Sequence, residues 1–289
     1  MLSLHTNAAA LSAQNSITRT QNSLSTSMTR LSTGFRINSA MDDAAGLQIA
    51  TRLKTQTSGM TVAMRNTQNS ISLMQTAEGA LDESTNILNR MKDLATQAAD
   101  DSSTAADRTA MQKEFDTLSD ELSNIFANTK FGGTALFNSA GGKLTAALKF
   151  QIGADSSETM TGDFTTELTQ VGTDIVAAAT GFVTTGVGAA AGAELTGSAN
   201  ATIGTLATAI DSVGALRSKL GAVSNRLDHV YNNLSNISTN TKNATGRIMD
   251  VDFAAESATM TASQMLLQAG TAMLKQSNSQ SSLVLSLLQ

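Results

Sequence analysis

Near the N-terminus, apolar residues recur at the three- and four-residue steps of a helix. They form one stripe made up of Ile17, Leu24, Met28, Leu31 and Phe35. This spacing predicts an amphipathic helix. Gly34 is expected to end it, because glycine readily adopts the left-handed conformation found just after helix ends.

The next stretch of the chain carries two neighbouring apolar stripes. The first contains Met60, Met64, Ile71, Met74, Leu81 and Leu88, and the second contains Leu73, Ala77, Ala80, Ile87, Met91 and Leu94. Two stripes on one helix predict two packing partners, as in a helical bundle. After a turn-like segment at 100–103, a periodic stretch from Met111 to Ile125 is expected to fold back antiparallel to it.

The longest periodic pattern lies towards the C-terminus. Its members are Ile203, Leu206, Ile210, Val213, Leu216, Leu220, Val223, Leu227, Val230, Leu234, Ile237, Ala244 and Ile248. They predict one continuous helix about 70 Å long at about 1.5 Å per residue, whereas a compact globule of this chain length is about 50 Å across. The sequence therefore predicts a mainly α protein, an elongated rod of long antiparallel helices.

The central region has a different pattern. Apolar and polar residues alternate from Leu144 to Ile152, and a turn at 155–157 precedes the stretch from Met160 to Phe164. This arrangement predicts a small β-hairpin beside the helices. Residues 171–198 are rich in Ala, Gly and Thr, show no firm period and are left unassigned.

The C-terminal segment carries adjacent apolar residues rather than a single stripe. They are Met265, Leu266, Leu267, Met273, Leu274, Leu283, Val284, Leu285, Leu287 and Leu288. Neighbouring residues point about 100° apart on a helix, so one companion helix from residues 2–35 can cover only one side. We therefore expect the chain ends to become ordered on assembly, through different patches on neighbouring copies that build a helical filament.

Composition and charge exclude several classes of function for this chain. The chain of 289 residues has a formal net charge of −5 and contains no Cys, Pro or Trp. The absence of Cys excludes disulfides, cysteine-bound metals and a thiol nucleophile, and the lack of a basic block argues against nucleic acid and anionic membranes as partners. No apolar run is long enough for a membrane span, and the first residues do not form a cleavable signal peptide.

Candidate catalytic and metal-binding residues are sparse. His5 and His229 have no Asp or Glu at ligand spacing, and the paired carboxylates Asp42–Asp43 and Asp250/Asp252 lack the remaining ligands of a calcium loop. We therefore expect no metal, no cofactor and no enzymatic activity.

Several motifs carry a resemblance to a known family. The run LSTGFRINSAMDDAAGLQIA at 31–50 resembles the N-terminal signature of bacterial flagellins. Further similar segments follow in the same order, namely QTAEGAL at 75–81, QIGA at 151–154, LRSKLGAV at 216–223, QAGT at 268–271 and VLSLL at 284–288. Residues 169–199 lack such a match.

The resemblance implies a domain organisation. Residues 1–40 and 255–289 would form an inner two-helix coiled coil on assembly, residues 45–168 and 200–250 an outer helical rod domain, and 169–199 a short variable region. The side chains expected to pack in the filament core are Ile17, Leu24, Met28, Leu31, Met265, Leu266, Leu267, Leu274, Leu285, Leu287 and Leu288.

The resemblance also implies partners and a route. A flagellin of this short form would be exported through the flagellar type III apparatus, without a cleaved signal peptide, and would polymerise outside the cell. It would meet a cytosolic chaperone, the export apparatus, the filament cap and the hook-junction proteins. A host Toll-like receptor would contact the positions of Arg90, Leu94 and Glu114, although Leu94 also belongs to an apolar stripe.

Other functions remain open at this point. The flagellin-like hook–filament junction proteins share the terminal helices but occur in few copies. A secretion needle or a pore-forming translocator would also have helical ends that order on assembly. Growth of long fibres from this chain alone would favour the filament subunit, and leakage of membranes would favour the translocator.

Overall fold

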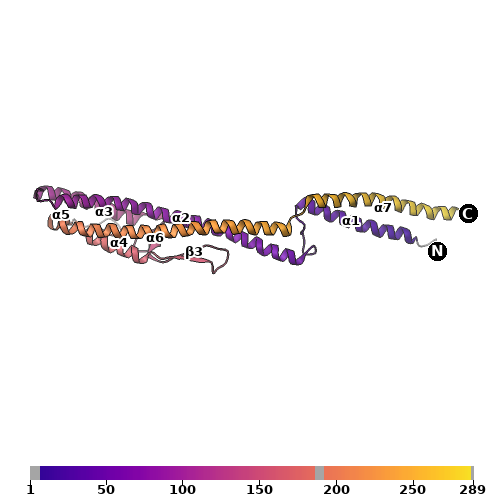
Figure 1. Ribbon diagram of the computed structural model, residues 1–289, viewed down its shortest axis with the longest axis horizontal. Coiled ribbons are helices and arrows are strands. Elements are labelled where there is room, and N and C mark those ends of the chain that lie inside the picture. The colour runs from indigo at the N-terminus through magenta and orange to yellow at the C-terminus, as the bar shows by residue number, and fades with distance from the viewer. Residues whose placement is uncertain (1–6, 186–191, 288–289) are drawn as a thin grey trace. The chain divides into compact units, whose positions relative to one another are not determined.

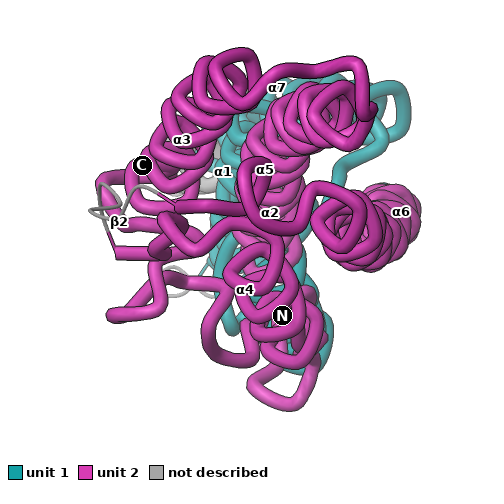
Figure 2. The backbone as a smooth tube through the Cα atoms, turned by 90° about the vertical axis from the view of Figure 1, so that its left-hand side faces the viewer, with its two compact units in different colours: residues 1–57, 239–289 teal, residues 58–238 magenta. Residues whose placement is uncertain are grey.

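The computed structural model describes residues 7–185 and 192–287, with side chains up to Ser279 (Figure 1). The described residues are mainly α-helical, as the sequence predicts, with two small antiparallel strand pairs. The chain divides into two compact units, one of residues 1–57 with 239–289 and the other of residues 58–238 (Figure 2). Helices α2 (Ala44–Ala98) and α6 (Ala199–Met249) contribute residues to both units.

The first unit contains helices α1 (Ala8–Thr33) and α7 (Phe253–Leu287), which pack against each other. The Asn7 side chain caps the start of α1 by accepting a hydrogen bond from the Ala10 amide at 3.1 Å. Gly34 ends α1 in the left-handed conformation, with φ of 76°. The prediction that Gly34 ends the first helix is confirmed.

The segments that join the helices of this unit are held together by backbone hydrogen bonds. The Arg36 amide donates to the Met249 carbonyl at 2.6 Å, and the Val251 amide donates to the Gly34 carbonyl at 3.0 Å. Ile37 is buried against Gly46, where a Cβ atom would lie 2.9 Å from the Ile37 Cδ1 atom. Only glycine therefore fits at position 46 without displacing its neighbours.

In the second unit, α2 is followed by a turn and by α3 (Ala105–Asn128). Thr104 and Asp107 form a capping box at the start of α3, in which each side chain accepts a hydrogen bond from the backbone amide of the other. The predicted turn at 100–103 and the helix after it are confirmed. So is the continuous long helix over 203–248, which lies within α6.

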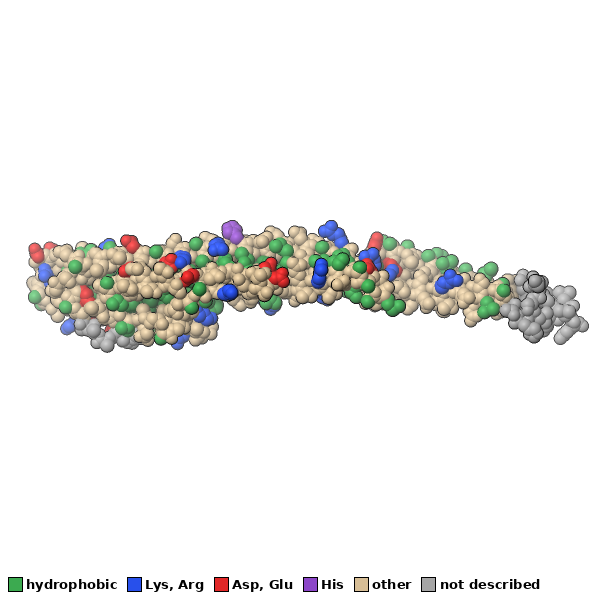
Figure 3. Space-filling view, turned by 90° about the horizontal axis from the view of Figure 1, so that it is seen from below, with side chains coloured by type: hydrophobic (Ala, Val, Ile, Leu, Met, Phe, Trp, Pro, Cys, Tyr) green, Lys and Arg blue, Asp and Glu red, His purple; other side chains and the backbone are tan. Residues whose placement is uncertain are grey.

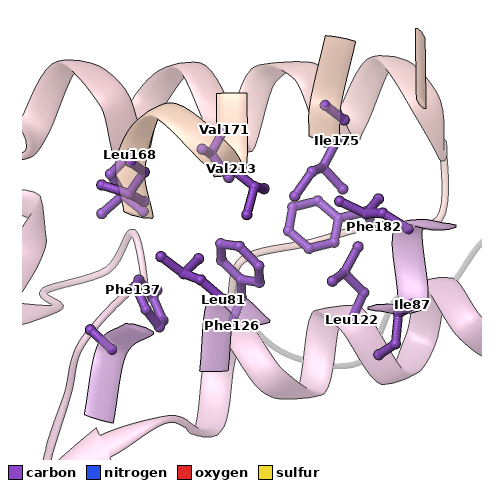
Figure 4. Close-up of a cluster of buried hydrophobic side chains, with 14 of the residues drawn as sticks. Leu81, Ile87, Leu122, Phe126, Phe137, Leu168, Val171, Ile175, Phe182 and Val213 are labelled. Atoms are coloured by element: carbon purple, nitrogen blue, oxygen red, sulfur yellow. The ribbon is translucent and has the colours of Figure 1, made fainter. Parts of the chain in front are cut away.

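The hydrophobic core of the second unit lies among α2, α3, α6 and the central segments. Phe126 stands at its centre, with its ring centroid 5.3 Å from those of Phe137 and Phe182, the latter in an edge-to-face arrangement (Figure 4). Leu81 and Val213 approach it from α2 and α6 (Figure 4). Both predicted stripes of α2 contribute side chains to this core.

Two short hairpins occupy the central region. Strands β1 (Lys130–Phe131) and β2 (Thr134–Ala135) pair around Gly132 and Gly133, both with positive φ. Strands β3 (Leu148–Gln151) and β4 (Thr159–Gly162) form the hairpin expected from the alternating pattern. The first strand is shorter than predicted, because residues 143–145 form a 3-10 turn that buries Leu144 completely.

A helix that the sequence pattern did not predict begins before the unassigned region 171–198 and extends into it. Helix α4 (Thr165–Ala178) buries one stripe made up of Leu168, Val171, Ile175 and Ala178. The short helix α5 (Glu194–Gly197) follows, joined to α3 by a hydrogen bond from the Leu195 amide to the Gln112 side chain at 2.7 Å. Residues 186–191 lie outside the described part of the chain.

Replacing Leu81 by Ala should strongly destabilise the second unit. Leu81 is fully buried, and such a truncation in a packed core lowers the free energy of unfolding by about 2–5 kcal/mol. Val62→Ala on the same helix is the control, since Val62 is 45% exposed and surface changes stay within about 0.5 kcal/mol. Chemical denaturation monitored by circular dichroism measures both, and equal effects would contradict the assigned core.

Candidate functional site

Helices α1 and α7 meet along a seam of residues spaced alternately three and four apart, the spacing typical of coiled coils. On α1 the seam consists of Ala13, Ile17, Thr20, Leu24, Ser27 and Leu31. On α7 it consists of Met260, Ser263, Leu267, Gly270, Leu274 and Ser277. Half of these twelve positions carry Ala, Gly, Ser or Thr, so the two helices approach closely but bury little apolar area per turn.

Polar contacts at both ends fix an antiparallel pairing. Near the start of α1, the Asn7 amide group donates to the Ser277 carbonyl at 3.1 Å. Near its end, the Ser27 hydroxyl donates to the Glu256 carboxylate at 2.5 Å. Between them Ile17 packs on Gly270, where a Cβ atom would lie 2.9 Å from the Ile17 Cγ1 atom.

The same two helices leave large apolar side chains uncovered outside the seam. Apart from Phe253, the first residue of α7, these are Leu11, Met28, Met265, Leu266 and Met273, which are between 51% and 67% exposed. We call these five residues the outer apolar set. Hydrophobic side chains are visible on the surface of these helices in Figure 3. Such uncovered apolar area is typical of surfaces that another protein covers.

The outer apolar set does not lie on one side. At about 100° per residue, Met265 is about 200° around α7 from the seam residue Ser263 and so lies on the back of the helix. Leu266 lies about 60° from Ser263, on the flank of the seam. One further partner packed against one side of α7 therefore cannot cover the whole set.

Charge contributes little to this surface. Helix α1 carries only Arg19 and Arg30, and α7 carries only Glu256 and Lys275. Most of the remaining side chains are Ser, Thr, Asn, Gln, Ala and large apolar residues. Any partner of this surface must therefore be bound through apolar burial and neutral hydrogen bonds.

The sequence predicted eleven filament-core residues as one set, and the structure divides those that it describes into two groups. Ile17, Leu24, Leu31, Leu267 and Leu274 lie in the seam, whereas Met28, Met265 and Leu266 belong to the outer apolar set. Leu285 and Leu287 are part of α7, but their side chains, and all of Leu288, lie outside the described residues.

Part of the surface was not on the predicted list. Leu11 is exposed, although no stripe included it, and Met273 is exposed about two turns from Leu266 on the same flank of α7. The small and polar seam residues Ser27, Ser263 and Gly270 were also missed. Extending the three- and four-residue steps through polar positions would have found the seam.

A charged cluster lies where α1 and α7 meet the segment before α2. Arg30 lies 3.7 Å from the Glu256 carboxylate and 4.0 Å from that of Asp42. The Asp42 carboxylate accepts hydrogen bonds from the amides of Ser39 at 2.8 Å and Asn38 at 3.1 Å, and from the Ser39 hydroxyl at 3.1 Å. The Ser39 amide, followed by the other donors and Arg30, lowers the pKa of Asp42 below its ordinary value.

The three residues matched to a receptor site lie in the second unit. The Arg90 Nη2 atom is 2.6 Å from the Glu114 Oε1 atom, and both side chains are about half exposed. This exposed ion pair joins α2 to α3. Leu94 differs, because it is 2% exposed and belongs to the core, so it offers no surface to a partner in this conformation.

The described residues show no arrangement suited to metal binding or to crossing a membrane. No group of three or more His, Asp or Glu among them could hold an ion. His229 is exposed on α6, and His5 lies outside the described part of the chain. None of the helices, over the residues described, combines the length and the apolar character of a membrane span.

Comparison with known families assigns the class of protein. The bacterial flagellin N-terminal helical region matches residues 4–141, and the bacterial flagellin C-terminal helical region matches residues 203–288. Together they include both α1 and α7 and most of the core of the second unit. The chain belongs to the flagellin family, and because flagellins are structural proteins, this membership supports the expectation that it is not an enzyme.

Two curated relatives are also flagellins. The chain is 53% identical to polar flagellin F of Vibrio parahaemolyticus and 50% identical to flagellin D of Vibrio cholerae, each over 157 residues, which are 54% of this chain and 41% of the relative. The match therefore spans about two fifths of the length of these relatives.

Two solved structures are also similar. A flagellin of Bacillus cereus aligns with 32% identity over 59% of this chain and 88% of its own, with a TM-score of 0.45. A putative flagellar hook-associated protein from Vibrio parahaemolyticus aligns over 72% of this chain and 100% of its own, with a TM-score of 0.55. At 17% identity the latter shows a shared fold only.

Acidification should remove the contribution of Asp42 to the stability of the first unit. Its folded-state pKa lies below the ordinary value of an Asp carboxyl, so this contribution is complete above the unfolded-state pKa and is lost as the pH falls through the lower folded-state pKa. An NMR titration of the Asp42 carboxyl carbon measures the folded-state pKa directly.

The Ser39→Ala variant tests the cause of this shift. It removes the hydroxyl donor and should raise the pKa of Asp42 part of the way to its ordinary value. Ser102→Ala is the matched control, because Ser102 donates to Asp100 instead. An Asp42 pKa that is not lowered from its ordinary value in the unsubstituted chain would contradict the described hydrogen bonds.

Proposed function

We propose that this chain is the repeating structural subunit of a bacterial flagellar filament and that it polymerises through its paired terminal helices. The observation that carries the proposal is the outer apolar set, five large side chains left uncovered on α1 and α7. Membership in the flagellin family supports this function, and the filament state is where copies of the same chain would cover these side chains.

The energetics favour many contacts per subunit over a single dimer. Full burial of a Met or Leu side chain contributes about 1.5–3 kcal/mol, so completing the burial of five half-exposed side chains contributes about 4–9 kcal/mol. Bringing two molecules together costs about 4–15 kcal/mol. A single contact is therefore marginal, whereas a polymer in which each subunit meets several neighbours gains more burial per copy.

The placement of the outer apolar set favours an open polymer. Met265 on the back of α7 and Leu266 on its flank require neighbours on different sides. Contacts between different patches of identical subunits are heterologous, and they generate helical filaments when the rotation between subunits does not close a ring.

The domain roles are part of the proposal. Residues 1–40 and 255–289 would line the inside of the filament, residues 45–168 and 200–250 would form its outer part, and 169–199 would be the variable region. Residues 169–178 of that region belong to α4. The family resemblance further supports export through the flagellar type III apparatus without a cleaved signal peptide, and an extracellular location in the flagellum.

The same resemblance supports the partners of that route, which are a cytosolic chaperone, the export apparatus, the filament cap and the hook-junction proteins. A junction protein of the flagellin family is the alternative identity. The hook-associated structure shares the fold but not the sequence, so the fold alone does not separate the two. They differ in self-association, because a junction protein does not grow long fibres of itself.

Polar substitution of the outer apolar set should block polymer growth. In Leu266→Gln/Met273→Gln, each change places an amide where a neighbour must cover an apolar side chain, so we expect the subunit concentration needed for growth to rise about tenfold or more. Growth is measured by electron microscopy and sedimentation after seeding with fragments of preformed filaments.

Gln276→Ser is the matched control, because it exchanges one exposed polar side chain for another on the same helix. It should grow with the same threshold as the unsubstituted chain. Failure of the unsubstituted chain to form long fibres at any concentration would reject the filament subunit and favour the junction protein. Leakage of lipid vesicles would instead favour a translocator.

A second proposal concerns recognition of the free subunit by an innate-immune Toll-like receptor. The exposed Arg90–Glu114 pair supports it, because a planar guanidinium beside a carboxylate presents both charges at one point on the surface. Leu94, the third matched residue, would act only by holding α2 in place, since its side chain is buried.

Substitution of the charged pair should weaken activation of that receptor without unfolding the protein. Arg90→Ala and Glu114→Ala remove exposed groups, and exposed ion pairs contribute little to stability. The measurement is receptor activation by the monomer in reporter cells, with thermal unfolding recorded in parallel. Arg65→Ala, which removes an exposed guanidinium elsewhere on the same helix, is the control, and unchanged activation in both pair variants would reject the contact.

A further inference from the structure

The exposed and the buried methionines of this chain lie in different units. Of the thirteen, those that the structure shows as exposed all belong to the first unit and are Met28, Met41, Met265 and Met273. Those that it shows as buried all belong to the second unit and are Met60, Met74, Met91, Met111 and Met160. Three of the exposed four are members of the outer apolar set.

An exposed thioether is open to oxidation. A peroxide transfers one oxygen atom to the sulfur, so the O–O bond breaks, an S=O bond forms and water leaves, and the product is methionine sulfoxide. The chain contains no Cys that could react first. Accessible methionine side chains are therefore the sulfur groups that a peroxide meets on this surface.

Oxidation would weaken self-association, because the outer apolar set must be buried against neighbouring copies. A sulfoxide is polar and accepts hydrogen bonds. Burying it without a hydrogen-bond donor is therefore unfavourable, whereas burying the apolar thioether is favourable. The charge-poor surfaces of α1 and α7 offer few strong donors to satisfy it. Oxidation thus converts attractive positions into repulsive ones without changing the fold of the subunit.

We propose that Met28, Met265 and Met273 form a reversible oxidation switch on the self-association surface, such that a subunit oxidised by a peroxide cannot add to the polymer. This inference rests on the proposed function. It deepens that function, because it names a chemical modification that regulates the same surface.

The three methionines are open to oxidation only before a subunit joins the polymer. In a free subunit the three side chains are between 55% and 67% exposed, whereas neighbours in a polymer would cover them. Oxidation therefore acts before incorporation and is slow afterwards. A methionine sulfoxide reductase reverses it, with two thiols forming a disulfide as the oxygen leaves as water.

The test treats the purified full-length chain with hydrogen peroxide before seeding. Peptide mass spectrometry measures sulfoxide at each methionine, with Met41, 96% exposed, as the reference for a fully accessible thioether. We expect Met28, Met265 and Met273 to oxidise at rates near that of Met41. The buried Met74 and Met91 should remain reduced. The concentration required for growth should rise about tenfold or more.

A triple variant assigns the effect to the three residues. Met28→Leu/Met265→Leu/Met273→Leu keeps apolar side chains of similar volume and removes the sulfur, so it should polymerise both before and after peroxide. Met41→Leu alone is the matched control and should remain sensitive, because the three switch residues are intact. Treatment of the oxidised, unsubstituted chain with methionine sulfoxide reductase should restore growth, which tests the same assignment without a substitution.

The outcomes separate the switch from the function on which it rests. If the unsubstituted, untreated chain forms no polymer, both proposals are wrong. If it polymerises, and still does so with the same threshold when the three sulfoxides are present, the filament function stands and the switch is rejected. Loss of growth that the reductase does not restore would also reject it.

Discussion

The architecture of the first unit depends on a geometric limit, which is that two helices can bury only one stripe of each other. Helices α1 and α7 use that stripe for a seam in which small and polar residues such as Ser27 and Gly270 alternate with Leu and Ile. Large apolar residues on the flank and back of the pair, such as Met265 and Leu266, then have no intramolecular partner. Because the limit is geometric, no rotation of these two helices against each other covers all of their large apolar side chains at once.

In the second unit, by contrast, the apolar stripes are covered within the unit itself. There α2 carries two apolar stripes and finds partners for both among α3, α6 and the central segments, so that residues such as Leu81, Phe126 and Val213 are completely buried. Such a core stabilises a fold without help from other copies. The exposed and buried methionines follow the same division between the units. One part of the chain therefore buries its apolar residues by itself, and the other leaves apolar side chains that the proposed filament would cover.

The sequence predicted the elements whose apolar residues repeat at regular spacing. It did not predict those whose structure depends on contacts made in the folded chain. The helices around Leu31, Leu81 and Leu216 were found because their apolar residues repeat at helical spacing. Helix α4 was missed because Ala, Gly and Thr surround its stripe and weaken the contrast on which a period depends. Leu144 was assigned to a strand because it continues an alternation, but glycines at 141 and 142 turn the chain, and its complete burial is a tertiary effect. In the candidate site the apolar members were predicted, but their division between seam and outer surface was not, since that division depends on how α1 and α7 are rotated.

That rotation connects local contacts to assembly. The hydrogen bonds of Asn7 with Ser277 and of Ser27 with Glu256, together with the packing of Ile17 on Gly270, fix the register of α1 against α7. A slip of one residue would turn α7 by about 100°, which would bring some members of the outer apolar set into the seam and expose some of the seam leucines. The polar contacts contribute little apolar burial of their own. Their effect is to determine which apolar side chains face outwards, and through this the small residues of the seam specify the surface that a neighbouring copy would match in the proposed filament.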